Sequence, residues 1–235
     1  MDAWEFADEV DVLAKLPANF DELRESKKWQ ERKEALEALA ALLDATVRLS
    51  TKASYGEILG NLQTMLAKDA NINVCALAAK CIKGFATGLR SKFSPYAQSI
   101  IPVVFDKLKE KKPLLRDPLV ECADAIAATI PSLEVIVEEI EANMGKPNPQ
   151  IKQQVDNFLS RQINLLTSDK IIEKDANINV AALAAKCMRG VAEGLRKKFA
   201  PHAPSVVPVI FDKFKEKKPL LRDPLVECID AIFAT

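Results

Sequence analysis

The sequence predicts an all-α protein that folds as a helical solenoid of about six stacked helix pairs. Three observations point to this class: few glycine and aromatic residues, a long internal duplication, and helix pairs that recur about every 40 residues. One such pair cannot bury its own apolar face, whereas stacked pairs share a continuous core. We therefore expect an elongated paddle with loops along both edges.

The duplication covers much of the chain. Residues Lys68–Thr129 align without gaps with Lys174–Thr235 at a constant offset of 106, and 47 of the 62 pairs are identical. Most of the exchanges are mild apolar substitutions, such as Ile82 to Met188 and Leu108 to Phe214. Because such exchanges conserve volume and polarity, both copies are expected to build the same packing.

Amphipathic periodicity gives the helices of each pair in chain order. A lead segment (1–18) precedes four helix pairs (19–165). Residues 166–235 are a near-copy of the second and third pairs, which either continues the solenoid or starts a truncated second unit. The predicted pairs are Asn19–Glu25 with Gln30–Asp44, Tyr55–Ala67 with Val74–Leu89, Tyr96–Lys107 with Leu115–Thr129, and Leu133–Met144 with Pro149–Leu165; the fifth and sixth repeat the second and third, with loops Lys174–Asn179 and Lys215–Pro219.

Capping residues support these boundaries. Asn73 is predicted to cap the helix that begins at Val74, since its side-chain oxygen can accept from free backbone N–H groups. Asn148 followed by Pro149 is typical of an N-cap with proline at the first helical position. Gly84 and Gly88 are expected to let neighbouring helices approach or to close the helix end.

The cysteines indicate buried, reduced thiols. The five cysteines are Cys75, Cys81, Cys122, Cys187 and Cys228. Their number is odd and they lie within apolar helical patterns, and the sequence has no CxxC motif or Cys/His cluster that could bind a metal. The chain shows no signal peptide and no uninterrupted apolar stretch of about 18 residues, so we expect a soluble cytosolic protein without a membrane segment. No metal or cofactor is expected.

Lysine occurs in every loop within a pair, and Trp29 lies in the first of these loops. Because all within-pair loops fall on one edge of a solenoid, these residues would form a row suited to an acidic protein surface. Trp29 could serve as an interface anchor or could pack under the start of its own helix, and each lysine could be ordinary solvated surface. The other edge is also basic, through Arg90, Lys92 and Arg196–Lys198, so charge alone does not choose the binding edge.

Several segments of the chain resemble TOG domains, the HEAT-repeat tubulin-binding modules of the microtubule polymerase family. Lys28–Leu36 (KWQERKEAL) resembles the opening repeat of these domains, and Leu77–Cys81 with Gly88–Arg90 resembles the second. The third and fourth repeats are similar to Phe105–Pro113 (FDKLKEKKP) and Lys146–Gln154 (KPNPQIKQQ). The match runs from about Val10 to Leu165.

The resemblance implies that the chain grips a curved α/β-tubulin heterodimer and supports microtubule growth at plus ends and spindle organisation. It places such a protein in the cytoplasm, on the microtubules of the spindle and centrosome, monomeric as an isolated domain. In that family the tryptophan of the first loop inserts against β-tubulin, the second and third loops support this contact, and the fourth loop reaches toward α-tubulin. The residues to which this assigns tubulin binding are Lys27, Lys28, Trp29, Asp69, Asn71, Asn73, Lys109, Lys111, Lys112, Pro113, Lys146, Asn148 and Lys152.

The chain departs from the family pattern after Leu165, where it returns to the second and third repeats. Either the copy begins a second TOG-like unit that lacks its first repeat, or the chain is a rearranged or recombinant product. Secondary tubulin contacts in the copy would come from Lys174, Asn177, Lys217 and Lys218.

Other functional classes have less support. His202 is the only histidine and aligns with Tyr96, so the fold does not require an imidazole there, and no nucleophile or phosphate-binding motif occurs. An enzyme is therefore not expected. The 33 basic and 33 acidic residues cancel, which argues against nucleic-acid binding. The main alternative is a HEAT-repeat adaptor for a different acidic protein.

Overall fold

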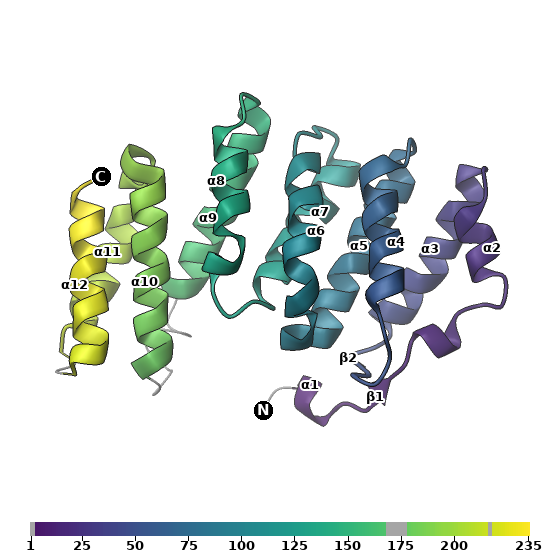
Figure 1. The fold of residues 1–235 in the computed structure, drawn as a ribbon, viewed down its shortest axis with the longest axis horizontal. Helices are drawn as coiled ribbons and strands as arrows, with labels where there is room; N and C mark the ends of the chain where they lie inside the picture. Colours follow the sequence, from purple (N-terminus) through teal and green to yellow (C-terminus); the bar gives the residue numbers. More distant parts are fainter. Residues whose placement is uncertain (1–2, 168–177, 216–217) are drawn as a thin grey trace. The chain divides into compact units, whose positions relative to one another are not determined.

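The computed structural model describes residues 3–167, 178–215 and 218–235 and confirms the all-α repeat prediction (Figure 1). The chain forms two compact units. Unit 1 consists of Met1–Pro131 together with Glu138–Gln154, and unit 2 consists of Ser132–Val137 together with Val155–Thr235.

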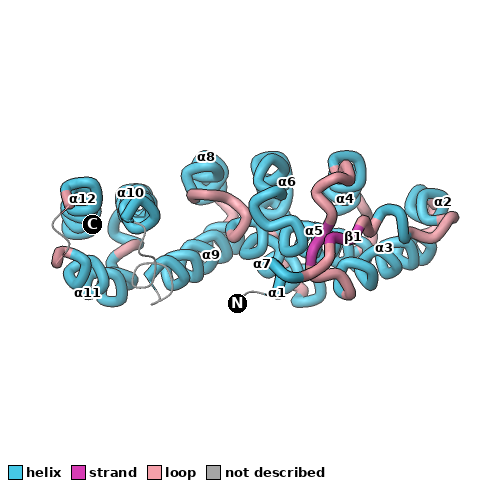
Figure 2. The backbone as a smooth tube through the Cα atoms, turned by 90° about the horizontal axis from the view of Figure 1, so that it is seen from below, coloured by secondary structure: helices cyan, strands magenta, loops and turns pink. Residues whose placement is uncertain are grey.

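Unit 1 has two helical layers, one with α2, α4, α6 and α8, the other with α3, α5 and α7 (Figure 2). Apolar residues at helical spacing, among them Leu36, Leu62, Ile82 and Phe105, are fully buried between the layers. The helices are α1 (Ala3–Phe6), α2 (Phe20–Glu25), α3 (Trp29–Asp44), α4 (Gly56–Lys68), α5 (Ile72–Leu89), α6 (Ser94–Lys107), α7 (Pro113–Ala127), α8 (Val137–Gly145) and α9 (Pro149–Thr167). Unit 1 includes α8 from Glu138 and α9 as far as Gln154.

The N-terminal lead segment is part of the fold of unit 1. Its strand β1 (Glu9–Val10) pairs in parallel with β2 (Arg48–Leu49), which follows α3. Upstream of β1, the indole Nε1 of Trp4 donates a hydrogen bond of 3.0 Å to the carbonyl oxygen of Gly88. The segment therefore closes the edge of the unit at which α5 ends (Figure 1).

Unit 2 contains α10 (Ile178–Leu195), α11 (Ala203–Lys213) and α12 (Pro219–Phe233), together with the rest of α9. Helices α10 and α12 lie side by side, as α5 and α7 do in unit 1. The copies agree in backbone detail: Arg90 and Arg196, at equivalent positions, both have a φ of 50°. The duplicated sequence thus folds locally in the same way in each unit.

Several predicted helix boundaries were wrong. Trp29 and Pro113, which we assigned to loops, are the first residues of α3 and α7, and proline favours that position because its φ is preset. The cap of α5 is Asn71 rather than Asn73, since the helix already begins at Ile72. Residues Leu133–Ile136 form a 3₁₀ turn before α8.

The fifth helix pair is described only in part. Its second helix is α10, but residues 161–167, which the repeat offset assigns to its first helix, instead complete α9. The predicted site residues Lys174, Asn177 and Lys217 lie outside the described residues.

Four of the five cysteines are free and buried, as predicted: Cys75, Cys81, Cys122 and Cys228. The side chain of Cys187 lies outside the described set. Among the described residues, no three His, Cys, Asp or Glu side chains gather closely enough to hold a metal ion. The stretch Ile72–Lys107 is long and apolar enough to cross a membrane by length and composition, but most of it is buried and it divides at Arg90 into α5 and α6.

Candidate interaction edge

The within-pair loops of unit 1 all lie at the same end of their helix pairs (upper ends in Figure 1). Loops 1 to 4 are, in order, Ser26–Lys28, Asp69–Asn71, Leu108–Lys112 and Lys146–Asn148. We call the row that they form the loop edge. The N-terminal segment and the β1–β2 pair lie at the opposite end of the unit. The structure thus brings the predicted basic residues of unit 1 together on one edge.

Loop 1 presents the indole of Trp29, which is 37% exposed at the start of α3. Glu31 accepts hydrogen bonds from two side chains of the preceding loop, Ser26 Oγ (2.5 Å) and Lys28 Nζ (2.8 Å), and Ser26 Oγ in turn accepts from the backbone N–H of Lys28 at 3.1 Å. The hydrogen bonds from Lys28 and Ser26 lower the pKa of Glu31, and the bond to Glu31 raises the pKa of Lys28. The indole is therefore presented by an ordered turn, and the charge of Lys28 is partly neutralised.

Arg32 ties loop 1 to loop 2. Its Nε and Nη2 donate to the two carboxylate oxygens of Asp69 at 2.7 and 2.9 Å, while its Nη1 donates to the carbonyl oxygens of Ser26 (2.8 Å) and Lys27 (3.0 Å). Only 5% of the Asp69 side chain is exposed. Burial opposes ionisation of Asp69, but the bonds from Arg32 and from the Asn71 N–H outweigh it and lower the pKa. Asp69 is thus engaged within the protein.

Loop 2 is shaped by its own polar side chains. Asp69 Oδ1 accepts from the backbone N–H of Asn71 at 2.8 Å, and Asn71 Oδ1 accepts from the N–H of Asn73 at 2.9 Å. The amide of Asn73 also donates to Asn71 Oδ1 at 3.1 Å. These bonds satisfy donors at the start of α5, so the two asparagines order the loop.

Asp106 links loop 3 to loop 4. At the end of α6, its carboxylate lies 3.0 Å from Lys109 Nζ and 3.3 Å from Lys146 Nζ. The hydrogen bond from Lys109, assisted by Lys146, lowers the pKa of Asp106. Within loop 3, Glu110 Oε1 accepts from the backbone N–H groups of Lys111 and Lys112 at 2.9 and 3.0 Å. The side chains of Lys111 and Lys112 in this turn are exposed.

Loop 4 ends in the predicted cap. Asn148 Oδ1 accepts from the N–H of Gln150 at 2.9 Å, and Pro149 is the first residue of α9, which confirms the sequence assignment. Between loops 3 and 4 lies an open hollow of about 600 Å³, lined by Lys109, Lys111, Pro147, Asn148, Pro149, Gln150 and Gln153. The hollow offers ammonium and amide donors to a partner.

The cations of the loop edge differ in availability. Lys28, Lys109 and Lys146 are in ion pairs. Within the described part of the chain, the other predicted lysines of unit 1 make no ion pair: Lys27, Lys111, Lys112 and Lys152. In unit 2, Lys218 is exposed immediately before α12.

Sequence reasoning missed three contributors to this edge. Arg32 and Asp106 position the loops, and their partners lie 37 and 40 residues away, a separation of about one repeat that could have indicated the contacts. Leu114 follows Pro113 in the first turn of α7 and is 53% exposed. An exposed leucine beside Lys111 and Lys112 adds an apolar contact to the edge.

No family model matches this chain, but known proteins with similar sequences exist. Zygote defective protein 9 of Caenorhabditis elegans is 37% identical over 415 aligned positions, which cover 100% of this chain and 29% of the relative. Spindle pole body component alp14 of Schizosaccharomyces pombe is 35% identical over 192 residues, covering 82% of this chain and 23% of the relative. The chain therefore spans less than a third of the length of these curated relatives.

A solved structure from work on microtubule plus-end tracking by XMAP215, CLIP-170 and EB1 decides the family. It is 30% identical with a TM-score of 0.65, and the match covers 96% of this chain and 95% of that one. The chain belongs to the XMAP215 family of TOG-domain proteins. A TOG-domain array from microtubule polymerases, 24% identical over 99% of this chain and 43% of its own, has a TM-score of 0.67 and shows the shared TOG fold.

Proposed function

We propose that unit 1 binds the α/β-tubulin heterodimer through the loop edge, and that the protein thereby supports microtubule growth at plus ends and spindle organisation. The observation that carries this proposal is the exposed indole of Trp29 at one end of a row of lysine-bearing loops in a TOG-family chain. It would act in the cytoplasm, on microtubules of the spindle and centrosome.

The two kinds of residue in the edge have different roles in this proposal. Exposed side chains make the contact: the indole supplies apolar area, and the ammonium groups attract an acidic surface and set its register. Buried and capping side chains hold the loops in place, so less conformational entropy is lost on binding. Contact is assigned to Lys27, Lys28, Trp29, Lys109, Lys111, Lys112, Pro113, Lys146 and Lys152, and positioning to Asp69, Asn71, Asn73 and Asn148.

The proposal needs no chemical step. Every residue of the edge is assigned to contact or to positioning, so we propose a binding module that catalyses no reaction and requires no cofactor. The stability of its complex with tubulin would depend on an apolar anchor and on charge pairing.

The full chain mixed with unpolymerised tubulin tests this function. We expect a complex on size-exclusion chromatography that weakens as salt rises, because exposed charge pairs are screened. Trp29→Ala should cost about 2 kcal/mol of binding free energy if the indole is an anchor. Phe6→Ala is the matched control, since Phe6 is an exposed aromatic (71%) at the opposite end of unit 1.

A charge-reversal pair tests the lysines separately. Lys111→Glu with Lys112→Glu should weaken tubulin binding, whereas Lys52→Glu, an exposed lysine between β2 and α4 at the opposite end, should not. Absence of a complex at low salt would reject the tubulin assignment and leave the adaptor hypothesis. Equal effects of the Trp29 and Phe6 substitutions would reject the loop edge as the binding surface.

A further inference from the structure

The two copies of the duplicated segment differ on their surface at one end only. Of the 15 differences between residues 68–129 and 174–235, nine fall on positions that are buried in unit 1 and six on positions that are exposed or half-buried there. All six surface differences lie between Lys83 and Gln98, in the second half of α5 and the first half of α6. This end of the helices is opposite the loop edge (Figure 1). The surface residues of loops 2 and 3 are therefore identical in both copies.

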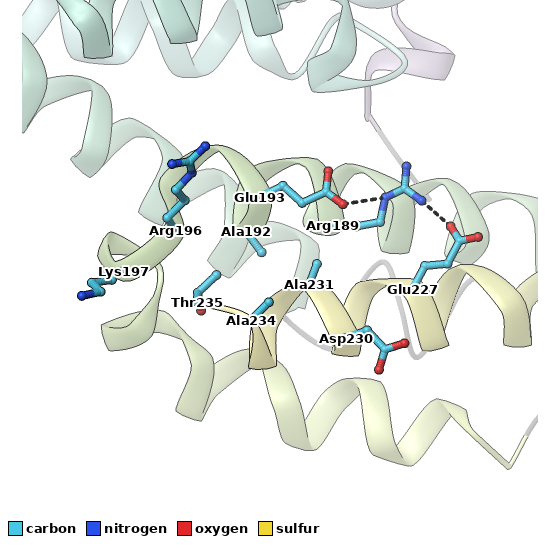
Figure 3. A pocket seen from close by; sticks show the side chains of 10 residues that line it. All are labelled: Arg189, Ala192, Glu193, Arg196, Lys197, Glu227, Asp230, Ala231, Ala234 and Thr235. Carbon is cyan, nitrogen blue, oxygen red and sulfur yellow. Dashed lines mark hydrogen bonds and ion pairs between the residues drawn. The ribbon is translucent and has the colours of Figure 1, made fainter.

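The changed end of unit 2 carries charges that unit 1 lacks. Glu193 and Lys197 stand where the first copy has a threonine and a serine, and Arg189 replaces a lysine. Arg189 Nε lies 3.5 Å from a carboxylate oxygen of Glu193 one turn along α10, and its Nη1 is ion-paired with Glu227 of α12 (Figure 3). These residues line an open hollow of about 750 Å³. The two copies thus differ in charge at the end where their surfaces have changed.

A recent duplication does not by itself explain this distribution. Chance differences would fall on exposed positions of both ends, and loops 2 and 3 with the first turns of α5 and α7 offer at least as many such positions as the changed end. The fold accounts for some of the unchanged residues, since Asn71 caps α5 and Pro113 begins α7. It does not account for Lys111, Lys112 and Leu114, whose side chains are exposed, because substitutions of exposed side chains cost little stability. A partner that contacts these side chains in both copies does account for them.

The start of α7 is built in the same way as the start of α12. We call residues 112–116 the loop 3 corner and residues 218–222 the copied corner, and both read KPLLR. The lysine before each helix has the same extended backbone, with φ and ψ of −71° and 123° at Lys112 and of −74° and 124° at Lys218. The copied corner therefore keeps the backbone of the loop 3 corner as well as its sequence.

Each corner exposes a leucine among cations. Leu114 is 53% exposed and Leu220 is 58% exposed, whereas the leucine that follows each of them is buried in its own unit. In the copied corner, Lys218 and Arg222 are exposed on either side of this leucine in the sequence. An apolar side chain flanked by positive charges suits an acidic protein surface that has an apolar depression.

We propose that the copied corner is a second docking surface for the partner of the loop edge, the α/β-tubulin heterodimer, with Leu220 as its apolar contact and Lys218 and Arg222 as its cations. This inference rests on the proposed function, from which it takes the identity of the partner. Both tryptophans of the chain belong to unit 1, so unit 2 has no indole to serve as an anchor. Leucine takes that part in unit 2.

The test uses the full chain with its loop edge disabled by Trp29→Ala, Lys111→Glu and Lys112→Glu. Labelled, unpolymerised tubulin is titrated with this chain at low salt, and its fluorescence anisotropy is measured. We expect residual binding. Adding Leu220→Ala and Lys218→Glu should reduce this residual affinity about tenfold, because the corner loses its apolar contact and one of its charges is reversed.

The matched control adds Val226→Ala and Lys197→Glu to the disabled chain instead. This pair makes the same change of charge and a similar apolar truncation, at exposed positions of unit 2 outside the copied corner. It should leave the residual affinity unchanged. Circular dichroism checks that all variants keep their helices, which we expect because the substituted side chains are exposed or half-exposed.

The outcomes separate this inference from the proposed function. If the unsubstituted chain binds tubulin and the disabled chain does not, the copied corner is no docking surface and the proposed function of unit 1 stands. Equal residual affinity of the corner and control variants would also overturn the inference. If the unsubstituted chain forms no complex with tubulin, both the proposed function and this inference are wrong.

Discussion

Arg32 and Asp69 form a two-pronged ion pair that joins neighbouring repeats, with Nε–Oδ2 and Nη2–Oδ1 distances of 2.7 and 2.9 Å. The same guanidinium holds the backbone of loop 1 through the carbonyl oxygens of Ser26 and Lys27. Geometry of this kind gives direction as well as energy, because the planar guanidinium fixes both carboxylate oxygens. The position of Trp29 relative to loop 2 therefore depends on a side chain that makes no contact in the proposed complex.

We predict that Asp69→Asn lowers the free energy of unfolding by about 2 kcal/mol at pH 7, because a largely buried Arg32 loses its charged partner. Asp106→Asn is the matched control. Asp106 also contacts cations in two loops, but its side chain is 48% exposed, so its loss should cost no more than about 0.5 kcal/mol. Urea unfolding followed by circular dichroism measures both values, and equal losses would contradict the prediction.

The same pair predicts an acid dependence of stability. The folded-state pKa of Asp69 is lowered, so its contribution is present above the unfolded value of about 3.9 and is lost as pH falls through the folded pKa. The wild-type chain should therefore lose stability below about pH 4, and Asp69→Asn should lose less over that interval. Urea titrations between pH 5 and pH 2.5 measure the free energy of unfolding of both proteins. If it falls by the same amount in each, the pair does not contribute to acid unfolding.

We predict that Trp4→Ala destabilises unit 1 by about 2 kcal/mol, because the indole loses a hydrogen bond to Gly88 and two cation–π contacts. Trp4→Phe should recover part of this loss, since a phenyl ring keeps a π-face but has no N–H donor. Thermal unfolding compares the three proteins. A neutral Trp4→Ala variant would mean that the lead segment is not needed for the stability of unit 1.

The cysteines should be slow to react in the folded protein. Burial raises the pKa of the thiols of Cys75, Cys81 and Cys122, and raises that of Cys228 to about 12, so little thiolate forms near neutral pH. With Ellman's reagent at pH 8, no more than one of the five thiols should react before unfolding. Rapid reaction of two or more would contradict the buried assignment.

Periodicity and duplication predicted the repeat fold well, because each helix needs only an apolar stripe and a capping residue to be recognised. Asn148 followed by Pro149 shows this, since both the cap and the first helical residue were found correctly. The role of Asp69 in joining loop 1 to loop 2 could not be predicted from periodicity or capping. Its sequence neighbours suggest a solvated loop, whereas its partner Arg32 lies one repeat earlier.

The lead segment was missed for a related reason. Trp4 stands in a short segment of mixed apolar and acidic residues in which no helical periodicity was recognised, and its partners Arg48, Gly88 and Arg90 are distant in the chain. Only the assembled unit brings two arginines and a carbonyl oxygen to one indole. Helix pairs are encoded locally, whereas the contacts that lock neighbouring pairs together are encoded at repeat distance.

The equivalent glycines Gly88 and Gly194 should respond with opposite signs to the same substitution. Gly88→Ala should destabilise unit 1 by about 1–3 kcal/mol, because the new methyl group would lie 2.6 Å from the buried side chain of Leu49. Gly194→Ala should stabilise α10 by up to about 1 kcal/mol, because alanine favours a helix and no described atom is close. Hydrogen exchange of the α5 and α10 peptides by mass spectrometry reports the two units separately. Destabilisation of both helices would show that Gly194 is already covered in solution, and stabilisation of both would show that Leu49 can move aside.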